Sequence, residues 1–320
     1  MSFRMESILW GLNTIKPLNF STDHYMKFLS YRSSNLFFEN TALWELAVAH
    51  GTPLYVYSEA ALIDNFQRID RAFAELPHTI CYALKANSNP ALLKKLASLG
   101  AGADVVSRGE LELALQAGID PQKIVFAGVG KCDDEIPAAL AKGIRGCNVE
   151  SEMELRVIDE LAGKYGKIAP ISLRINPNID IHGHPYISTG RHHDKFGIAL
   201  ETVKKLAADF AAFPNCELIG LHAHLGSQVA DVAPYAELGK VLCTLIREVQ
   251  AAGHTLCYID VGGGLGVDYS QPIEVAADAH GRDDFAFDPS AIATAIASEI
   301  GSLGIEIIFE PGRALIANTG

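Results

Sequence analysis

Eight short runs of apolar and β-branched residues recur along this chain, and segments with the spacing of amphipathic helices lie between them. This alternation predicts parallel strands joined by helical crossovers. The expected strands are TICYALKAN (79–87), GADVVS (102–107), KIVFAGVG (123–130), RGCNVES (145–151), ISLRINP (171–177), LIGLHAHLGS (218–227), YIDVGGG (258–264) and IEIIFEPGR (305–313). The expected helices are 90–99, 110–117, 134–141, 151–165, 202–213, 233–252 and 288–303.

Eight strand–helix repeats predict an α/β fold, a closed (β/α)8 TIM barrel over residues 61–315, which is close to the roughly 250 residues that such a barrel needs. A doubly wound open sheet is the alternative. It is weakened because the one phosphate-type glycine run follows the seventh strand, whereas open dinucleotide-binding sheets carry it after the first.

The N-terminal part of the chain does not follow this rhythm. Residues 36–60 are expected to supply a strand and the start of a helix to a second, β-rich domain, with PLYVYS (53–58) as the strand. Residues 1–35 show no clear periodicity and stay unplaced. The segment 178–195 is polar and rich in histidine, and loops of this length in compact domains are more often functional than not.

Charge and cysteine content narrow the possible partners. The formal net charge is -12, from 26 basic and 38 acidic residues, which argues against nucleic-acid or anionic membrane partners. Six cysteines occur without a C-x-x-C pair, mostly inside apolar runs, and this predicts reduced, buried thiols in a cytoplasmic protein. No segment has the length and apolarity of a membrane-spanning helix.

Lys85 stands where the apolar run of the first strand stops. A lysine there can simply mark the surface end of a strand. The alternative is a partly desolvated amine, whose pKa burial would lower, so that it could act as a nucleophile and form a Schiff base. Almost all of the remaining predicted strands also end in polar or glycine residues, and active sites of barrels lie at the carboxyl ends of the strands. This concentration of polar residues favours the interpretation of Lys85 as a Schiff-base lysine.

Two glycine-containing strand ends predict a phosphate site. Gly262, Gly263 and Gly264 offer backbone N–H groups without side-chain crowding, and the next strand ends with Gly312 and Arg313. A glycine triplet alone is more often only a tight turn. Phosphates in barrels are nevertheless commonly held between the seventh and eighth strands, where both features lie.

Glu310 ends a buried strand, where an unpaired carboxylate is costly. An internal salt bridge with Arg313 or Arg174 would explain it. Pyridoxal phosphate offers a second explanation, because this cofactor needs a lysine, a phosphate site and an acidic partner for its ring nitrogen. Lys85, the two glycine segments and Glu310 supply that set, so the sequence predicts pyridoxal 5'-phosphate as the cofactor.

The histidines of HAHLGSQ alternate along one strand, so His222 and His224 face the same side. A metal site is disfavoured because no carboxylate accompanies them in the motif. We expect His224 to lie flat against the cofactor ring, Ser227 to reach the phosphate and His222 to be structural. His192 and His193 are expected to be solvated.

Several segments resemble the fold-type III pyridoxal-phosphate decarboxylases, and within them the diaminopimelate branch. The matching segments are PLYVYS, YALKAN, ADVVSRGEL, NVESEMEL, RINPNIDIHGHPYISTGRHHDKFGI, GLHAHLGSQ, IDVGGGLGVDY and EPGRALIANTG, in order and spacing. The resemblance covers residues 35–320 and implies an alanine-racemase-like barrel with a second β-rich domain. It implies removal of CO2 from the D-configured centre of meso-2,6-diaminopimelate, which yields L-lysine.

The resemblance also implies roles for individual residues. Lys85 would bind the cofactor covalently, His224 would stack on its ring and Glu310 would pair with its nitrogen. The phosphate would be held by Ser227, Gly262, Gly263, Gly264 and Gly312, with Pro311 in the same segment. Arg313 would lie near the phosphate and a substrate carboxylate. Asp104, Glu110 and Arg174 would support this network.

The chain departs from the family pattern at both ends. Its first 30 residues have no counterpart in the pattern, and residues 316–320 only begin the further β segment, whose "CES"-type cysteine and acid and late tyrosine reach a partner subunit's site. An incomplete gene and a homodimeric whole protein are therefore expected. The alternatives are an ornithine- or arginine-type decarboxylase, or a barrel that binds the cofactor without decarboxylating. A small-molecule amino acid is the expected substrate.

Overall fold

The computed structural model describes residues 28–179, 196–269 and 285–320. The predicted loop at 178–195, with His192 and His193, lies almost wholly outside these residues. Two compact units divide the chain: one holds 28–54 of the described residues, and the other holds the described residues from Tyr55 onward.

The first unit contains a small antiparallel sheet and a helix. Strands β1 (Leu29–Arg32) and β2 (Asn35–Phe38) form a hairpin, β3 (Thr41–Ala42) pairs with β2, and α1 (Leu43–His50) follows. The two-residue turn places Ser33 and Ser34 at positive φ, as tight hairpin turns require. The sheet thus begins inside the segment that the sequence left unplaced.

The expected strand PLYVYS is wrong. No strand is present at 53–58 in the structure, and Tyr55 is 86% exposed. This segment has no neighbouring strand to pair with its backbone groups among the described residues. Ser58 instead begins the next helix, because its side chain accepts a hydrogen bond from the N–H of Ala61.

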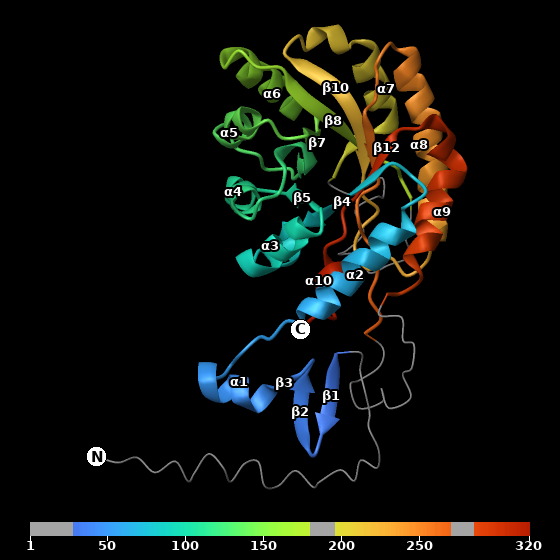
Figure 1. Ribbon diagram of the computed structural model, residues 1–320. Coiled ribbons are helices and arrows are strands. Elements are labelled where there is room, and N and C mark those ends of the chain that lie inside the picture. Colours follow the sequence, from blue (N-terminus) through green and yellow to red (C-terminus); the bar gives the residue numbers. More distant parts are fainter. Residues whose placement is uncertain (1–27, 180–195, 270–284) are drawn as a thin grey trace. The chain divides into compact units, whose positions relative to one another are not determined.

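The second unit is a closed parallel barrel, which confirms the predicted fold class (Figure 1). Within the described residues each strand hydrogen-bonds to the next in the ring, and β12 closes it onto β4. The ring consists of β4 (His78–Ala83), β5 (Gly102–Val105), β6 (Ile124–Phe126), β7 (Gly146–Val149), β8 (Ala169–Asn176), β10 (Cys216–Ala223), β11 (Tyr258–Asp260) and β12 (Glu306–Phe309). A two-residue strand, β9 (Ile198–Ala199), pairs with the end of β8.

Helices lie outside the strands (Figure 1). They are α2 (Glu59–Ala72), α3 (Pro90–Ser98), α4 (Arg108–Gln116), α5 (Glu135–Lys142), α6 (Glu152–Lys164), α7 (Leu200–Ala208), α8 (Ala233–Ala251), α9 (Pro289–Ile300) and the short α10 (Arg313–Ile316). The predicted helix ends differ from these by a few residues. The expected helix 202–213 stops at Ala208 and continues as a single 3₁₀ turn, Phe210–Ala212.

The core has two parts because successive strand residues face opposite sides. The larger part packs between the strands and the helices and includes most of the buried leucine and isoleucine side chains. A smaller cluster contains Cys81, Val125, Ile219, Tyr258 and Ile308. On two of these strands the residue two positions further along is polar: Asp260 after Tyr258 and Glu310 after Ile308. The interior therefore changes from apolar to polar toward the carboxyl ends of the strands.

Two other expectations from composition can be compared with the structure. No helix in the described ranges is long and apolar enough to cross a membrane. All six cysteines are free thiols, of which Cys81, Cys147 and Cys216 are buried while Cys132 and Cys257 are exposed.

The Tyr258 side chain packs inside the barrel against Gly220 and Gly146, and this close packing gives a testable prediction. A Cβ atom at Gly220 would lie 2.7 Å from Tyr258 Cε2, and one at Gly146 would lie 2.6 Å from its hydroxyl. Gly220→Ala is expected to lower the free energy of unfolding by about 1–3 kcal/mol in urea melts, because overpacking strains a filled core.

Combining this change with Tyr258→Leu is expected to cost less than the sum of the two single changes. Gly130→Ala is the control, since a Cβ there meets nothing within 4 Å. Strictly additive losses would contradict the proposed steric contact.

Candidate active site

Lys85 lies just beyond the end of β4, in a 3₁₀ turn formed by Leu84–Ala86. Its Nζ atom is 2.5 Å from Oδ2 of Asp104 on β5. The Lys85 side chain is 54% exposed, whereas that of Asp104 is completely buried. The amine therefore stands at the mouth of the barrel and is held by a carboxylate beneath it.

The expected effect of burial on Lys85 is wrong in its net direction. Burial does lower the pKa of this amine, but the charges of Asp104 and Glu310 raise it by more, so the pKa lies above its ordinary value. Burial, followed by the charge of Glu310, also raises the pKa of Asp104. In the protein without cofactor Lys85 is thus a charged ion-pair partner, and a proton must leave before it can react as a nucleophile.

A cavity of about 380 Å³ opens beside Lys85. This volume lies within the usual range for small-molecule sites. Most of the predicted site residues line it, together with six that the sequence did not single out as site residues. The lining comprises Ala83, Lys85, Ala86, His224, Ser227, Gly264, Leu265, Tyr269, Glu310, Pro311, Gly312, Arg313, Ile316 and Ala317.

The glycine loop after β11 packs tightly against the neighbouring strand ends. A Cβ at Gly263 would lie 2.0 Å from the carbonyl oxygen of Glu310, so only glycine fits there. The N–H of Gly262 donates to Asp260 Oδ1 at 2.9 Å, and the N–H of Gly263 donates to Nδ1 of His224 at 3.2 Å. Of the three glycines, only Gly264 lines the cavity. Gly262 and Gly263 thus shape the loop.

Arg313 lines the cavity and contacts two other lining residues, Ser227 and Tyr269. Its Nε donates to Ser227 Oγ at 3.3 Å, and its Nη1 donates to the hydroxyl of Tyr269 at 3.1 Å. The arrangement places a guanidinium and a hydroxyl together on one side of the cavity, as an anion site requires. Tyr269 was not identified from the sequence, where a single tyrosine after the glycine run carries little signal.

Arg174 and Glu110 lie outside this cavity lining. Arg174 Nη1 donates to Glu150 Oε1 at 2.6 Å, and both side chains are buried. Glu110 lies in the first turn of α4, where its Oε2 accepts a hydrogen bond from the N–H of Val106 at 2.8 Å. Arg174 therefore acts through the charge network of the interior, and Glu110 stabilises a helix start.

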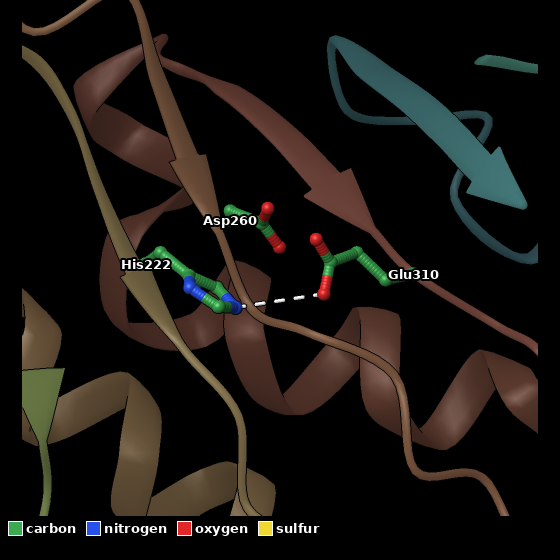
Figure 2. A group of neighbouring side chains, drawn as sticks. All are labelled: His222, Asp260 and Glu310. Atoms are coloured by element: carbon green, nitrogen blue, oxygen red, sulfur yellow. Dashed lines mark ion pairs between the residues drawn. The ribbon is translucent and has the colours of Figure 1, made fainter. Parts of the chain in front are cut away.

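Glu310 is paired in a way that the sequence did not suggest. The salt bridge expected with Arg313 or Arg174 is not found among the described residues. Instead, His222 Nε2 lies 3.5 Å from Glu310 Oε2, and the carboxylate of Asp260 lies beside them (Figure 2). One atom from each of the three residues lies within 4.8 Å of the others. His222, expected to be structural, therefore contacts a predicted cofactor residue.

The pKa values of the two carboxyl groups in this cluster are shifted in opposite directions. Burial and then the charge of Glu310 raise the pKa of Asp260 well above its ordinary value. Burial also acts to raise the pKa of Glu310, but His222 and Lys85 lower it by more, and its pKa lies below the usual range. Two like charges at such a separation repel by about 3–4 kcal/mol at an effective dielectric constant of ~20, which disfavours ionisation of both groups at once.

Comparison with known proteins identifies the family. The model of the pyridoxal-dependent decarboxylase pyridoxal-binding domain matches residues 59–317. The diaminopimelate decarboxylase of Haemophilus influenzae is 42% identical over 296 residues, which span 92% of this chain and 68% of that protein. The Aquifex aeolicus enzyme is also 42% identical, over 92% of this chain and 67% of its own length.

The chain belongs to the diaminopimelate decarboxylase family. Solved structures agree with this assignment. The Helicobacter pylori diaminopimelate decarboxylase complexed with L-lysine superposes with a TM-score of 0.80 at 39% identity, covering 87% of this chain and 67% of that one. The M. jannaschii diaminopimelate decarboxylase in co-complex with L-lysine gives 0.81 at 33% identity, covering 92% and 68%.

The cavity of this diaminopimelate decarboxylase family member fits pyridoxal phosphate, the cofactor that the family's barrel domain binds. Lys85 would offer an amine for the cofactor, and the adjacent Arg313 and Ser227 side chains would offer donors for its phosphate. A Cβ at Gly312 would lie 3.2 Å from the Cβ atoms of Ala83 and Ala86, so small residues leave this side of the cavity open. Glu310 Oε1 is buried and has no hydrogen-bond partner among the described residues.

His224 gives a prediction about pH. Burial and then the charges of Arg174 and Lys85 lower the pKa of its imidazole to about 3. An unfolded histidine titrates near 6.5, so between these values the unfolded chain binds the extra proton. The free energy of unfolding of the cofactor-free protein is expected to fall as the pH drops from 6.5 toward 4.

His224→Gln is expected to make that fall shallower in urea melts recorded across this range. An NMR titration of the histidine rings provides the direct measurement, in which His224 should stay neutral above pH 4. A normal titration near pH 6.5 would contradict the predicted neutral state.

Proposed function

We propose that this protein decarboxylates meso-2,6-diaminopimelate to L-lysine with pyridoxal 5'-phosphate as its cofactor. The observation that carries the proposal is the cavity in which Lys85, Glu310 and Arg313, from strands at opposite ends of the barrel sequence, meet at one site. The family membership and the lysine complexes of two structural relatives support this choice of substrate.

The residues of the chain have separate tasks in this proposal. Lys85 binds the cofactor covalently, after Asp104 has held it in place as an ion-pair partner. Ser227, Gly264 and Gly312 surround the phosphate, and Arg313 supplies positive charge beside it. Asp104 and Arg174 balance charge beneath the site. When bound, the cofactor supplies an electron sink for the bond that loses CO2.

Glu310 and His224 control the electronic state of the ring. An anionic Glu310 beside the ring nitrogen keeps a proton there, which the electron sink requires. A neutral His224 presents a flat, uncharged surface to a ring that carries positive charge. Because burial keeps the pKa of His224 low, the ring and the imidazole do not repel each other.

The rim of the cavity is the proposed location for the substrate. Arg313 and Tyr269 together offer donors suited to a carboxylate of the amino acid. A homodimer and a cytoplasmic location are further parts of the proposal. The six free cysteines support a reducing compartment. The family resemblance in sequence supports the dimer.

Cofactor attachment provides the test. Purified protein mixed with pyridoxal phosphate is expected to show the absorption band of a lysine Schiff base, and borohydride reduction with peptide mapping should find the cofactor on Lys85. Lys85→Ala is expected to abolish the band. Lys95→Ala is the matched control, because that lysine pairs with Glu59 elsewhere in the barrel unit. Label scattered over several lysines would contradict the assigned site.

Substrate choice is tested separately by CO2 release. Turnover is expected with meso-2,6-diaminopimelate. The turnover rate with ornithine or arginine is expected to be at least 100-fold lower, because a site built for two charged ends rejects analogues that leave its polar groups unpaired. Preference for ornithine or arginine would overturn the proposed substrate while leaving the cofactor site intact.

A further inference from the structure

We propose that Asp260 carries a proton and shares it with Glu310, and that Asp260 and His222 together hold the Glu310 carboxylate as an anion for the cofactor ring. Both are positioning residues, since they act through Glu310. The inference rests on the proposed function for its purpose, but the proton on Asp260 can be observed without the cofactor.

The geometry leaves one Glu310 oxygen for Asp260. Glu310 Oε2 faces His222 Nε2 at 3.5 Å, and the second oxygen, Oε1, lies on the side of Asp260 (Figure 2). Oε1 is buried and has no hydrogen-bond partner among the described residues. A buried carboxylate oxygen without a donor is costly. A proton on the neighbouring carboxyl group would supply the missing donor.

The partners of Asp260 are neutral. Its Oδ1 accepts the Gly262 N–H at 2.9 Å, and its Oδ2 accepts the Asn148 side-chain amide at 3.3 Å. No ion pair of Asp260 with lysine or arginine occurs within the described ranges. An ionised Asp260, completely buried, would thus place a second negative charge against Glu310 without a cation of its own.

The nearby cations already have partners. Lys85 is bonded to Asp104, and Arg174 is bonded to Glu150. His222 Nε2 faces Glu310 Oε2 at 3.5 Å, and neither nitrogen of this ring makes a hydrogen bond among the described residues. If Asp260 is protonated, Glu310 is the one carboxylate of the pair without a lysine or arginine partner. If Asp260 is ionised, both carboxylates lack such a partner. The raised pKa of Asp260 agrees with the first arrangement.

This arrangement has a consequence for the cofactor. A neutral Asp260 donor and the His222 donor both stabilise Glu310 as an anion, which leaves its charge for the protonated ring nitrogen. Without these donors Glu310 would become more basic and would compete with the ring for the proton. The same three residues offer atoms within metal-binding reach of one another, so a bound cation is the competing explanation for their proximity.

Infrared spectroscopy of the cofactor-free protein is the first test. With aspartate labelled with ¹³C at its side-chain carboxyl carbon, a protonated carboxylic acid band is expected at pH 7. The band should disappear in Asp260→Asn and persist in Asp104→Asn, the matched buried carboxylate. A band that is absent, or that Asp104→Asn removes instead, overturns the proposal whatever the protein catalyses.

The second test reads the ring nitrogen directly, by NMR of protein loaded with ¹⁵N-labelled pyridoxal phosphate. Asp260→Asn is expected to keep the protonated nitrogen signal, because a neutral amide replaces a neutral acid. Asp260→Ala is expected to shift the signal toward the unprotonated form and to weaken cofactor binding about tenfold or more. Ile259→Val, one position earlier on β11, is the control for packing.

The outcomes separate the two proposals. Equal damage from Asp260→Asn and Asp260→Ala would mean that Asp260 acts as an anion, which overturns the inference. Failure of the unmodified protein to bind the cofactor would instead count against the proposed function. Because Asp260→Ala can fail to fold, the comparison of Asp260→Asn with the unmodified protein is decisive by itself.

His222 and the metal alternative are tested with the same samples. His222→Gln keeps an amide donor near Glu310 and is expected to retain the protonated nitrogen signal, whereas His222→Leu is expected to lose part of it. Titration of the cofactor-free protein with Zn²⁺ should show no stoichiometric site that depends on Asp260. A tight site of that kind would mean that Asp260 is an ionised ligand and would overturn the shared proton.

Discussion

The compensation of buried charge governs the interior of this barrel at its carboxyl end. Four carboxylates are buried in or beside it: Asp104, Glu150, Asp260 and Glu310. In the part of the chain that the structure describes, only Lys85 and Arg174 form short ion pairs with members of this set. Removing an ion from water costs several kcal/mol unless partners replace the lost hydration. The polar contacts of the site offset this desolvation cost.

The groups that compensate each buried carboxylate differ from strand to strand. Asp104 is compensated by a lysine that is itself half exposed, so the pair can separate when another group takes the lysine. Glu150 is compensated by a buried arginine and by the N–H of Gly197, which makes it a fixed part of the framework. Glu310 is left with a histidine and a second carboxyl group. Lys85 and Glu310, to which we assign cofactor attachment and the electronic control of its ring, thus occupy the two least rigidly compensated positions.

The barrel itself was predictable from the sequence, because the period of apolar residues changes between strand and helix at every repeat. The site was predictable as a set of strand ends, since a closed parallel barrel brings Lys85, His224, Glu310 and Arg313 together whatever the details. Their mutual contacts were not. The partner of Lys85 stands on the next strand, and Asp260 reads in the sequence as the start of a glycine turn. The strand expected at PLYVYS is absent because a run of residues with high strand propensity does not by itself provide a neighbouring strand.

The seam where the barrel closes runs through the cofactor cavity. Lys85 follows the first strand of the ring, and Glu310 and Arg313 follow the last. There β12 meets β4 through three paired positions, and two further bonds join the Ala83 N–H to the Pro311 carbonyl and the Ile307 N–H to the Pro77 carbonyl. A molecule bound covalently to Lys85 and by its phosphate near Arg313 would bridge that seam. Loading of the cofactor would then add a connection between the first and last strands of the ring, and ligand binding would add directly to the stability of the closed fold.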